Sequence, residues 1–248
     1  MSWFSRKKET KQEIDLGGVL QTDIHSHLLP GIDDGAQTID ESISLIKEME
    51  ELGYKKMIIT PHVRYGYFDN DTSTFDSRLE ELKRNVKMAG INMEFEVGAE
   101  QSVDEEFSRR IENNELKSFG KNKYLLIEFF PFTEIPMGYK QTLFSLQTKG
   151  YNLILAHPER YLYLYNDEKT LEELKDRGML FQMNIISLSG YFGEPVKKFA
   201  EKLIKNDMID LLGTDLHGIR HINALKNTLH NVVLASLLDS GKIMNKKF

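Results

Sequence analysis

The sequence predicts an α/β fold in which parallel strands close, or nearly close, into a barrel. About seven short apolar runs alternate with amphipathic segments from one end of the chain to the other. No change of composition, internal repeat or linker divides the 248 residues, and single α/β barrels commonly have this length. Polar clusters follow the expected strands, as they do at the carboxyl-terminal rim of such a barrel.

The first expected helix carries the clearest local signals. Thr38 and Glu41 form a capping box at its start, and Gly53 follows its last turn, where glycine is favoured. The other elements are assigned from apolar periodicity. We expect strands at residues 19–24, 56–60, 93–97, 124–128, 152–156, 180–184 and 209–212. We expect helices at residues 39–52, 75–89, 104–113, 139–149, 168–177, 195–206 and 222–238.

We assign residues 1–18 to an N-terminal tail and residues 19–248 to one domain. The tail carries Trp3, Phe4 and a basic cluster, and it lacks the apolar core of a signal peptide. We expect a solvated leader, with weak docking to an anionic membrane or protein surface as the alternative. No later segment is apolar enough to span a bilayer, so we expect a cytoplasmic protein without a transmembrane segment.

Composition excludes several classes of function. The net charge of −6 argues against a nucleic-acid groove, which would need a basic face. Bound divalent cations would neutralise part of this charge. The chain has no cysteine, which excludes disulfides, thiolate zinc sites and a cysteine nucleophile.

Histidines and carboxylates gather where the predicted strands end, and five of the seven histidines lie there. Burying so many charged groups is costly unless they meet a partner such as a metal ion. His25 and His27 are two residues apart, so both side chains share one face of a strand and could bind one ion. Asp23 shares that face, either as a further ligand or as a group that orients a histidine.

The other polar segments repeat this placement. Asp34 lies in a turn-rich loop, where it is a good carboxylate donor beside two histidines, and we expect Asp33 to support the loop. Glu100 follows two small residues, which let its carboxylate reach inward and bridge two cations. Each residue alone could be a satisfied polar side chain, but together they predict a multinuclear metal site. The predicted ligands are His25, His27, Asp34, His62, Glu100, His157, Asp215 and His217.

The remaining candidates lie just beyond these segments. We expect His230 to be a surface or packed residue of the last helix. His221 is expected at a helix start, and its neighbour Arg220 keeps a substrate role open. Arg64, which follows His62 in a loop, is another candidate for contact with substrate.

The motifs together resemble those of a known group of enzymes. The segments are Asp23-Ile24-His25-Ser26-His27, Asp33-Asp34-Gly35, Thr60-Pro61-His62, Gly98-Ala99-Glu100, Ala156-His157-Pro158-Glu159-Arg160 and Thr214-Asp215-Leu216-His217. In this order they resemble the polymerase-and-histidinol-phosphatase (PHP) superfamily. The run from Asp23 to Gly35 resembles, more narrowly, the bacterial manganese-dependent protein-tyrosine phosphatases of capsule and exopolysaccharide operons.

This resemblance implies a distorted (β/α)₇ TIM-like barrel in a single PHP domain, with two or three divalent metal ions. Carried over motif by motif, the predicted ligands divide among three ions. The first would be held by His25, His27, Glu100 and Asp215, the second by Glu100, His62 and His157, and the third would be completed by Asp34 and His217. The resemblance also implies that Arg160 helps to hold the phosphate.

Ligands that are all nitrogen and oxygen suit Mn²⁺, Fe²⁺ or Zn²⁺, and the resemblance favours Mn²⁺. A water between two cations loses a proton near neutral pH, and the hydroxide would attack phosphorus. A tyrosine leaving group, with a pKa of ~10, needs less proton donation than a serine alkoxide. We expect Arg160, Asp34 and Glu100 to be catalytic and Arg160, Arg220 and Arg64 to bind substrate.

The expected substrate is a phosphotyrosine protein, an autophosphorylated bacterial tyrosine kinase that governs polysaccharide synthesis. Four aromatic residues near the rim suit contact with a phosphotyrosine ring and loop packing equally well: Tyr65, Tyr67, Phe68 and Phe132. A small-molecule phosphatase, such as one for histidinol phosphate, is the alternative. The acidic charge disfavours a nuclease, and the intact ligand set disfavours a non-enzymatic domain. The oligomeric state stays open.

Overall fold

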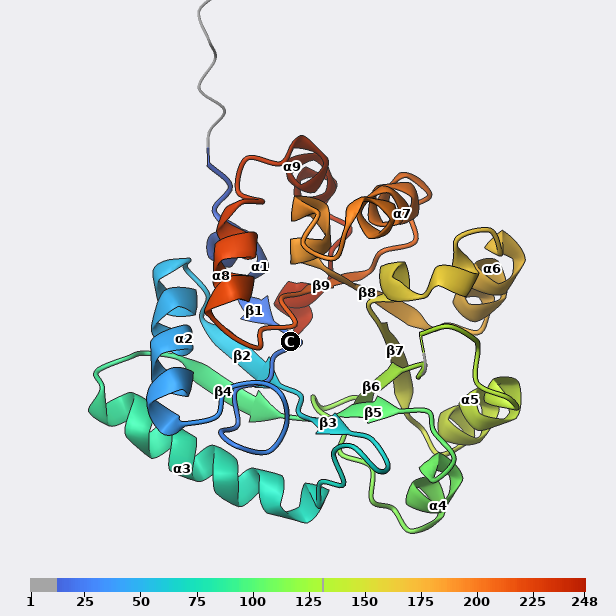
Figure 1. Cartoon of the computed structure of the whole chain (residues 1–248), viewed down its shortest axis with the longest axis horizontal. Helices are drawn as coiled ribbons and strands as arrows, with labels where there is room; N and C mark the ends of the chain where they lie inside the picture. Colours follow the sequence, from blue (N-terminus) through green and yellow to red (C-terminus); the bar gives the residue numbers. More distant parts are fainter. Residues whose placement is uncertain (1–12, 131) are drawn as a thin grey trace, which may run out of the picture.

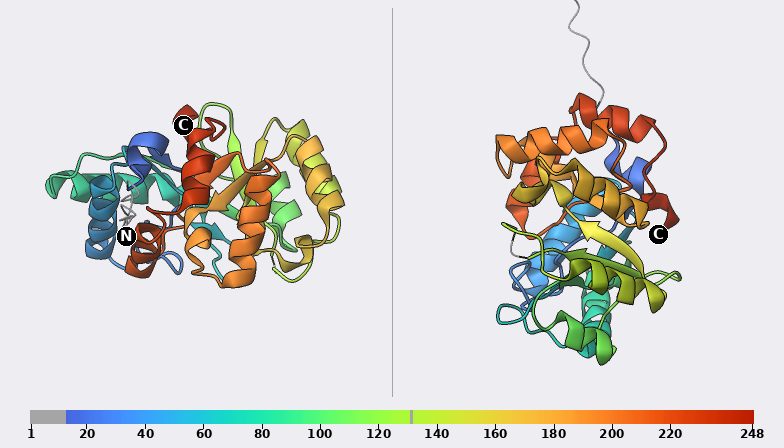
Figure 2. Two further views of the ribbon diagram at one scale, coloured as in Figure 1. Left: turned by 90° about the horizontal axis from the view of Figure 1, so that it is seen from above. Right: turned by 90° about the vertical axis from the view of Figure 1, so that its right-hand side faces the viewer.

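Strands lie in the middle of the molecule and helices surround them (Figures 1 and 2). The structure is a computed structural model that describes residues 13–130 and 132–248. All strand pairs are parallel. A three-stranded sheet contains β1 (Thr22–Asp23), β2 (Lys56–Ile59) and β4 (Glu94–Val97). A six-stranded sheet contains β3 (His62–Val63), β5 (Glu100–Ser102), β6 (Tyr124–Glu128), β7 (Asn152–Ala156), β8 (Leu180–Asn184) and β9 (Leu211–Gly213).

Most helices match their predicted positions within three residues at each end. The helices of the described residues are α1 (Leu16–Leu20), α2 (Ile39–Glu51), α3 (Phe75–Met88), α4 (Phe107–Glu112), α5 (Tyr139–Thr148), α6 (Glu168–Asp176), α7 (Glu194–Lys205), α8 (Ile219–Lys226) and α9 (Val232–Asp239). Half of the expected capping box is present: the Glu41 amide donates to Thr38 Oγ1 at 3.2 Å, but the Glu41 carboxylate accepts from the Gln37 amide at 2.7 Å, one residue before the position that a capping box requires. No helix of the described residues is long and apolar enough to cross a membrane.

Two short segments of the chain connect the two sheets, because in each place a strand of the first sheet is followed after two residues by a strand of the second. β2 is followed by β3 across Thr60-Pro61, and β4 is followed by β5 across Gly98-Ala99. The two outer edges also meet at one point, where Ser26 forms a bridge with Leu216. The ladders as described nevertheless form two sheets. They establish a single α/β domain with parallel sheets, and a closed barrel of seven strands is not confirmed.

Two predicted elements are wrong. The expected strand at 19–24 begins as α1, and only Thr22–Asp23 is extended, because Gln21 turns the chain with a φ of 62°. The expected helix at 222–238 is divided into α8 and α9. Asn231 starts the second helix, since its side chain accepts hydrogen bonds from the amides of Val233 and Leu234.

The domain begins earlier than the assigned boundary at residue 19 would suggest. Leu16 and Leu20 are each 1% exposed, and the Ile14 amide donates to the Leu229 carbonyl at 2.9 Å. Residues 13–18 of the expected tail therefore pack on the domain. Trp3, Phe4 and the basic cluster lie outside the described residues.

The core has two parts. The larger part lies between the strands and the helices, and a smaller cluster includes Ile24, Ile58, Leu126, Ile154 and Leu211. Residues two apart on a strand share a face. Two positions beyond each named residue of the smaller cluster, the same face of the strand therefore reaches the carboxyl end, where the polar clusters lie.

Candidate metal centre and phosphate pocket

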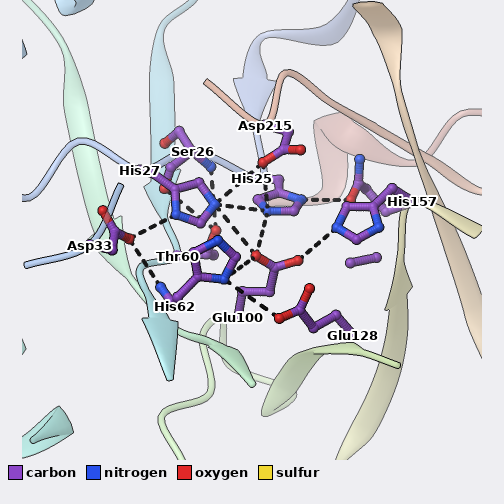
Figure 3. Close-up of polar contacts among 12 residues, drawn as sticks. His25, Ser26, His27, Asp33, Thr60, His62, Glu100, Glu128, His157 and Asp215 are labelled. Atoms are coloured by element: carbon purple, nitrogen blue, oxygen red, sulfur yellow. Dashed lines mark hydrogen bonds and ion pairs between the residues drawn. The ribbon is translucent and has the colours of Figure 1, made fainter. Parts of the chain in front are cut away.

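Four predicted ligands from three strand ends form the centre of the site (Figure 3). His25 Nε2 lies 3.2 Å from His27 Nε2 and 3.4 Å from Glu100 Oε2. Asp215 Oδ1 is 3.4 Å from Nε2 of each histidine. All four side chains are buried. The structure thus brings the residues expected around a first ion together, with their nitrogen and oxygen atoms 3.2 to 3.4 Å apart.

The outer ring nitrogens of the two histidines have their own partners. His25 Nδ1 lies 2.8 Å from Gln182 Oε1, and His27 Nδ1 lies 2.8 Å from Asp33 Oδ2. Asp33 also accepts hydrogen bonds from the amides of Gly35 and His62, at 3.0 and 3.1 Å. Asp33 therefore supports the loop, and both rings turn Nε2 toward the centre.

Asp23 lies beneath this centre and does not join it. Its carboxylate accepts hydrogen bonds from Thr214 Oγ1 at 2.6 Å and from the Thr214 amide at 2.9 Å. Burial raises its pKa to about 6. Asp23 therefore takes neither of the two expected roles: it contacts no histidine ring among the described residues, and it ties β1 to the segment after β9.

Glu100 lies between the first group and a second one. Its Oε1 is 2.8 Å from His157 Nε2, and its Oε2 is 3.0 Å from His62 Nδ1. Glu128 Oε1 is 3.6 Å from the same nitrogen of His62. Glu128 escaped the sequence analysis, although it ends β6 in the placement that singled out the others.

The third group lies nearer the surface. Asp34 Oδ1 is 3.2 Å from His217 Nε2 and 3.5 Å from His62 Nε2. The His217 ring also stacks on that of His27, with 3.9 Å between the ring centres. The Asp34 side chain is 59% exposed, so it is the most accessible of the predicted ligands. His62 thus faces two groups, one with each ring nitrogen.

The donor atoms have the spacing and charge that divalent cations require. Two ligands that each lie ~2.0–2.2 Å from an ion are about 3–3.5 Å apart, as the central atoms are here. Glu100 Oε2 and His62 Nδ1 are buried and lie 3.0 Å apart, but neither forms a hydrogen bond among the described residues. Buried polar atoms that face each other without a hydrogen bond are costly, and a cation between them would satisfy both. The residues present therefore fit bound metal ions.

Electrostatics keep the carboxylates ionised. Burial would raise the pKa values of Glu100 and Asp215, but the surrounding histidines hold both well below their usual range. Burial would lower the pKa of His25, but the charges of Glu100 and Asp215 raise it to about 10. Without cations the cluster therefore attracts protons, and cations would compete for the same atoms.

A pocket of about 330 Å³ opens over the cluster and contains two arginines. Arg160 Nη1 donates to Asp215 Oδ2 at 3.2 Å, and the guanidinium carbon lies 4.7 Å and 4.6 Å from the ring centres of Phe132 and Phe192. Arg64 pairs with Glu128 and donates to Ser102 Oγ at 3.0 Å. Both arginines line the pocket, as predicted for substrate-binding residues.

The other candidates divide between the pocket and its surroundings. Arg220 is exposed, and the described pocket wall includes its neighbour His221 instead. Phe132 lines the pocket, whereas Phe68 stacks on His62 with the ring centres 5.2 Å apart. Tyr191 also lines the pocket and was missed, since it follows no strand.

The fold and the site define an α/β protein in which histidines and carboxylates that could hold metal ions gather at the ends of parallel strands, beside a pocket lined by two arginines. Residues 21–232 match the model of the family described as "Capsular polysaccharide synthesis, CpsB/CapC". The chain belongs to this family. The resemblance seen in the motifs is thereby confirmed.

Known relatives extend over most of the chain. The sequence is 33% identical to CapC of Staphylococcus aureus, over 90% of each chain. It is 31% identical to the tyrosine-protein phosphatase YwqE of Bacillus subtilis, over 81% of this chain and 79% of the relative. A solved chain from a study of YwqE from Bacillus subtilis and CpsB from Streptococcus pneumoniae, "unique metal-dependent tyrosine phosphatases", is 27% identical. It matches with a TM-score of 0.77 and covers 91% of this chain and 94% of its own.

A more distant structure shares the fold alone. Histidinol phosphate phosphatase from Lactococcus lactis is 13% identical, with a TM-score of 0.56 over 90% of this chain and 94% of its own. The likeness agrees with an α/β fold of the PHP kind and carries no inference about substrate.

Proposed function

We propose that this protein is a metal-dependent phosphotyrosine-protein phosphatase, a hydrolase of phosphoric monoesters. The observation that carries the proposal is the convergence of histidines and carboxylates from separate strand ends beside Arg160. The chain also belongs to a family whose relatives YwqE and CpsB are named tyrosine-protein phosphatases.

Two or three divalent cations, with Mn²⁺ preferred over Fe²⁺ or Zn²⁺, would supply Lewis-acid stabilisation and an activated water. The first ion would be held by His25, His27, Glu100 and Asp215, the second by Glu100, His62 and His157, and the third would be completed by Asp34 and His217. Glu128 lies close enough to His62 to serve as an additional ligand. Glu100 supports this division best, because its Oε2 lies 3.4 Å from His25 Nε2 of the first group and its Oε1 lies 2.8 Å from His157 Nε2 of the second.

Arg160 is the residue that would hold the phosphoryl group. Among the N–H donors of its guanidinium, only Nη1 forms a hydrogen bond to a described residue, Asp215. The remaining N–H groups are free to form paired, charge-assisted bonds to phosphate oxygens. The rings of Phe132 and Phe192 fix the plane of the guanidinium. Arg64 has fewer donors to offer, because Nε and Nη2 already contact Ser102 and Glu128.

The other predicted residues contribute according to their exposure. Asp34 is open to solvent beside His217. Burial would raise the pKa of the Asp34 carboxyl, but the hydrogen bond and charge of His217 hold it well below its usual range, so Asp34 would serve as a metal ligand in its ionised form. A phenolate leaves with a pKa of ~10, so it needs little proton donation. Arg220 would act on a longer substrate that extends beyond the pocket, since it is exposed.

The biological setting is proposed from the family. An autophosphorylated bacterial tyrosine kinase that controls capsule or exopolysaccharide synthesis is the expected substrate, and the family description supports this setting. We place the reaction in the cytoplasm, with Trp3, Phe4 and the basic cluster of the expected tail as a candidate contact to the membrane. The bridge between Ser26 and Leu216 supports a distorted (β/α)₇ barrel closed at this rim.

The test is hydrolysis of a phosphotyrosyl peptide by protein that has been stripped with chelator and reloaded with Mn²⁺. Phosphoseryl peptide and histidinol phosphate serve as competing substrates. Turnover of the phosphotyrosyl peptide above both others supports the proposal. Preference for histidinol phosphate would move the protein to small-molecule phosphatases and leave the metal site in place.

A further inference from the structure

Strand β8 differs from its neighbours β7 and β9, because no predicted metal ligand follows it. It carries two buried amides instead, Gln182 and Asn184, which are each 0% exposed. They are two residues apart on the strand and therefore share a face. Buried amides need hydrogen-bond partners, and these two find them among the residues of the cluster.

The two amides form a continuous chain of hydrogen bonds, the amide relay, between two predicted ligands. Asn184 Nδ2 donates to Asp215 Oδ2 at 2.7 Å. Gln182 Nε2 donates to Asn184 Oδ1 at 2.9 Å, and Gln182 Oε1 lies 2.8 Å from His25 Nδ1. The relay thus connects the outer edges of Asp215 and His25, whose inner atoms are 3.4 Å apart.

The relay has a direction that the carboxylate sets. An ionised carboxylate only accepts hydrogen bonds, so Asn184 must turn its NH₂ toward Asp215 and its oxygen toward Gln182. Gln182 must then donate to that oxygen, which leaves its own oxygen facing His25. When a bound cation keeps the His25 ring neutral, the hydrogen of the ring is therefore on Nδ1. Nε2 keeps its lone pair, and it points at His27 and Glu100.

An independent feature shows that the backbone makes room for this arrangement. A Cβ atom at Gly213 would lie 2.7 Å from Gln182 Nε2 and 2.8 Å from His25 Cβ. Any larger residue there would displace one end of the relay. Because Gly213 at the end of β9 has no side chain, the Gln182 side chain of β8 can pass over it and contact His25.

We propose that Gln182 and Asn184 are positioning residues, which set the tautomer of His25 and orient Asp215 for a divalent cation. Neither touches the reacting phosphate. The inference rests on the proposed metal site, because the relay matters only if His25 and Asp215 share an ion. Partners of this kind change metal affinity by 10- to 100-fold in characterised sites.

The matched pair of variants is Gln182→Leu and Gln101→Leu. Gln101 is also 0% exposed, but neither atom of its amide has a hydrogen-bond partner among the described residues. Titration of the metal-free proteins with Mn²⁺ by calorimetry measures affinity directly. Gln182→Leu should weaken the tightest site by about 10- to 100-fold, and Gln101→Leu should leave it within about twofold.

The tautomer supplies a readout that a loss of packing would not change. Long-range ¹H–¹⁵N spectra of Zn²⁺-loaded protein should show His25 protonated on Nδ1. Gln182→Glu keeps an acceptor opposite that nitrogen, so it should retain the signature and bind Mn²⁺ more tightly than Gln182→Leu. This variant decides the matter if Gln182→Leu does not fold.

Two results would overturn the inference. One is wild-type Mn²⁺ affinity in folded Gln182→Leu, and the other is a hydrogen on Nε2 of His25 in the Zn²⁺-loaded protein. A wild-type protein that binds no metal would instead refute the proposed function, so the two failures can be told apart.

Discussion

The two ends of the central strands share a backbone and have opposite chemistry. Toward the amino ends, Leu126 and Ile154 in the middle of β6 and β7 belong to a small apolar cluster against which Phe248 packs, with the Phe248 ring 4.7 Å from that of Tyr124, the first residue of β6. At the carboxyl ends, the same inward face carries Glu128, and His157 follows β7. Two residues along a strand thus separate an apolar layer, which contributes only to folding stability, from a layer of charged side chains that could bind metal ions.

The amino-end layer is also closed by polar contacts that are fully satisfied. Asn245 donates to the carbonyls of Thr22 and Leu212, at 2.9 and 2.7 Å, and accepts from the Leu212 amide at 3.0 Å. In the rim layer, by contrast, Glu100 Oε2 faces the nitrogens of His62, His25 and His27 at 3.0, 3.4 and 3.5 Å without forming a hydrogen bond to any described residue. The difference teaches that polar groups at the amino ends satisfy one another, whereas the donor atoms at the rim leave room for cations.

Among the variants that test this contrast, Glu100→Gln should have the largest effect on activity and on bound metal. The amide cannot bridge cations, so we expect kcat/KM for a phosphotyrosyl peptide to fall by about 10³-fold. Bound metal, measured by elemental analysis, should fall with it, while the circular dichroism spectrum stays that of the wild type. Full activity with a normal metal content would contradict the bridging role.

Ile154→Ala should affect only the apolar layer. Ile154 is 0% exposed, so the substitution should lower the free energy of unfolding by about 2–5 kcal/mol. Urea unfolding measures this loss, and the metal content of the folded protein should not change. A loss of metal without a loss of stability would show that the two layers are not separate.

Arg160→Ala should weaken catalysis and leave the metal in place. We expect kcat/KM to fall by about 10²-fold, because a charge-assisted, bidentate contact is removed. Arg160→Lys should recover little, since an ammonium cannot reproduce the planar fork. Arg220→Ala is the companion variant: an increase in KM supports its predicted contact with substrate, and an unchanged KM excludes it.

Phe192→Leu should have the smallest effect. Removing one of the two rings that hold Arg160 should lower kcat/KM by about two- to fivefold, as expected for a partly exposed cation–π contact. Phe192→Tyr, which keeps a ring, should remain near the wild type. Equal losses in both variants would mean that the ring does not position Arg160.

The sequence predicted the strand ends well because each apolar run is short and bounded by polar or small residues. It located the predicted ligands for the same reason, and the structure brings them together. The prediction of one helix at 222–238 failed, because the apolar pattern continues through the turn between α8 and α9, which Asn231 closes. The prediction of a strand at 19–24 also failed, because a short apolar run fits a helix as well as a strand.

The residues that sequence reasoning missed fall into two kinds. Glu128 stands at a strand end and could have been found by the rule that found Glu100. Gln182 and Asn184 could not, because amides on a strand are unremarkable until β8 is placed beside β9 and His25. That proximity joins residues 157 positions apart and is visible only in three dimensions.

The most direct test of the central claim is a count of metal ions per chain. Protein stripped with chelator and dialysed against Mn²⁺ should bind two or three ions, and phosphotyrosyl-peptide hydrolysis should return in proportion to the ions bound. Failure to bind Mn²⁺, Fe²⁺ or Zn²⁺ would contradict the account, and so would hydrolysis that survives complete removal of metal.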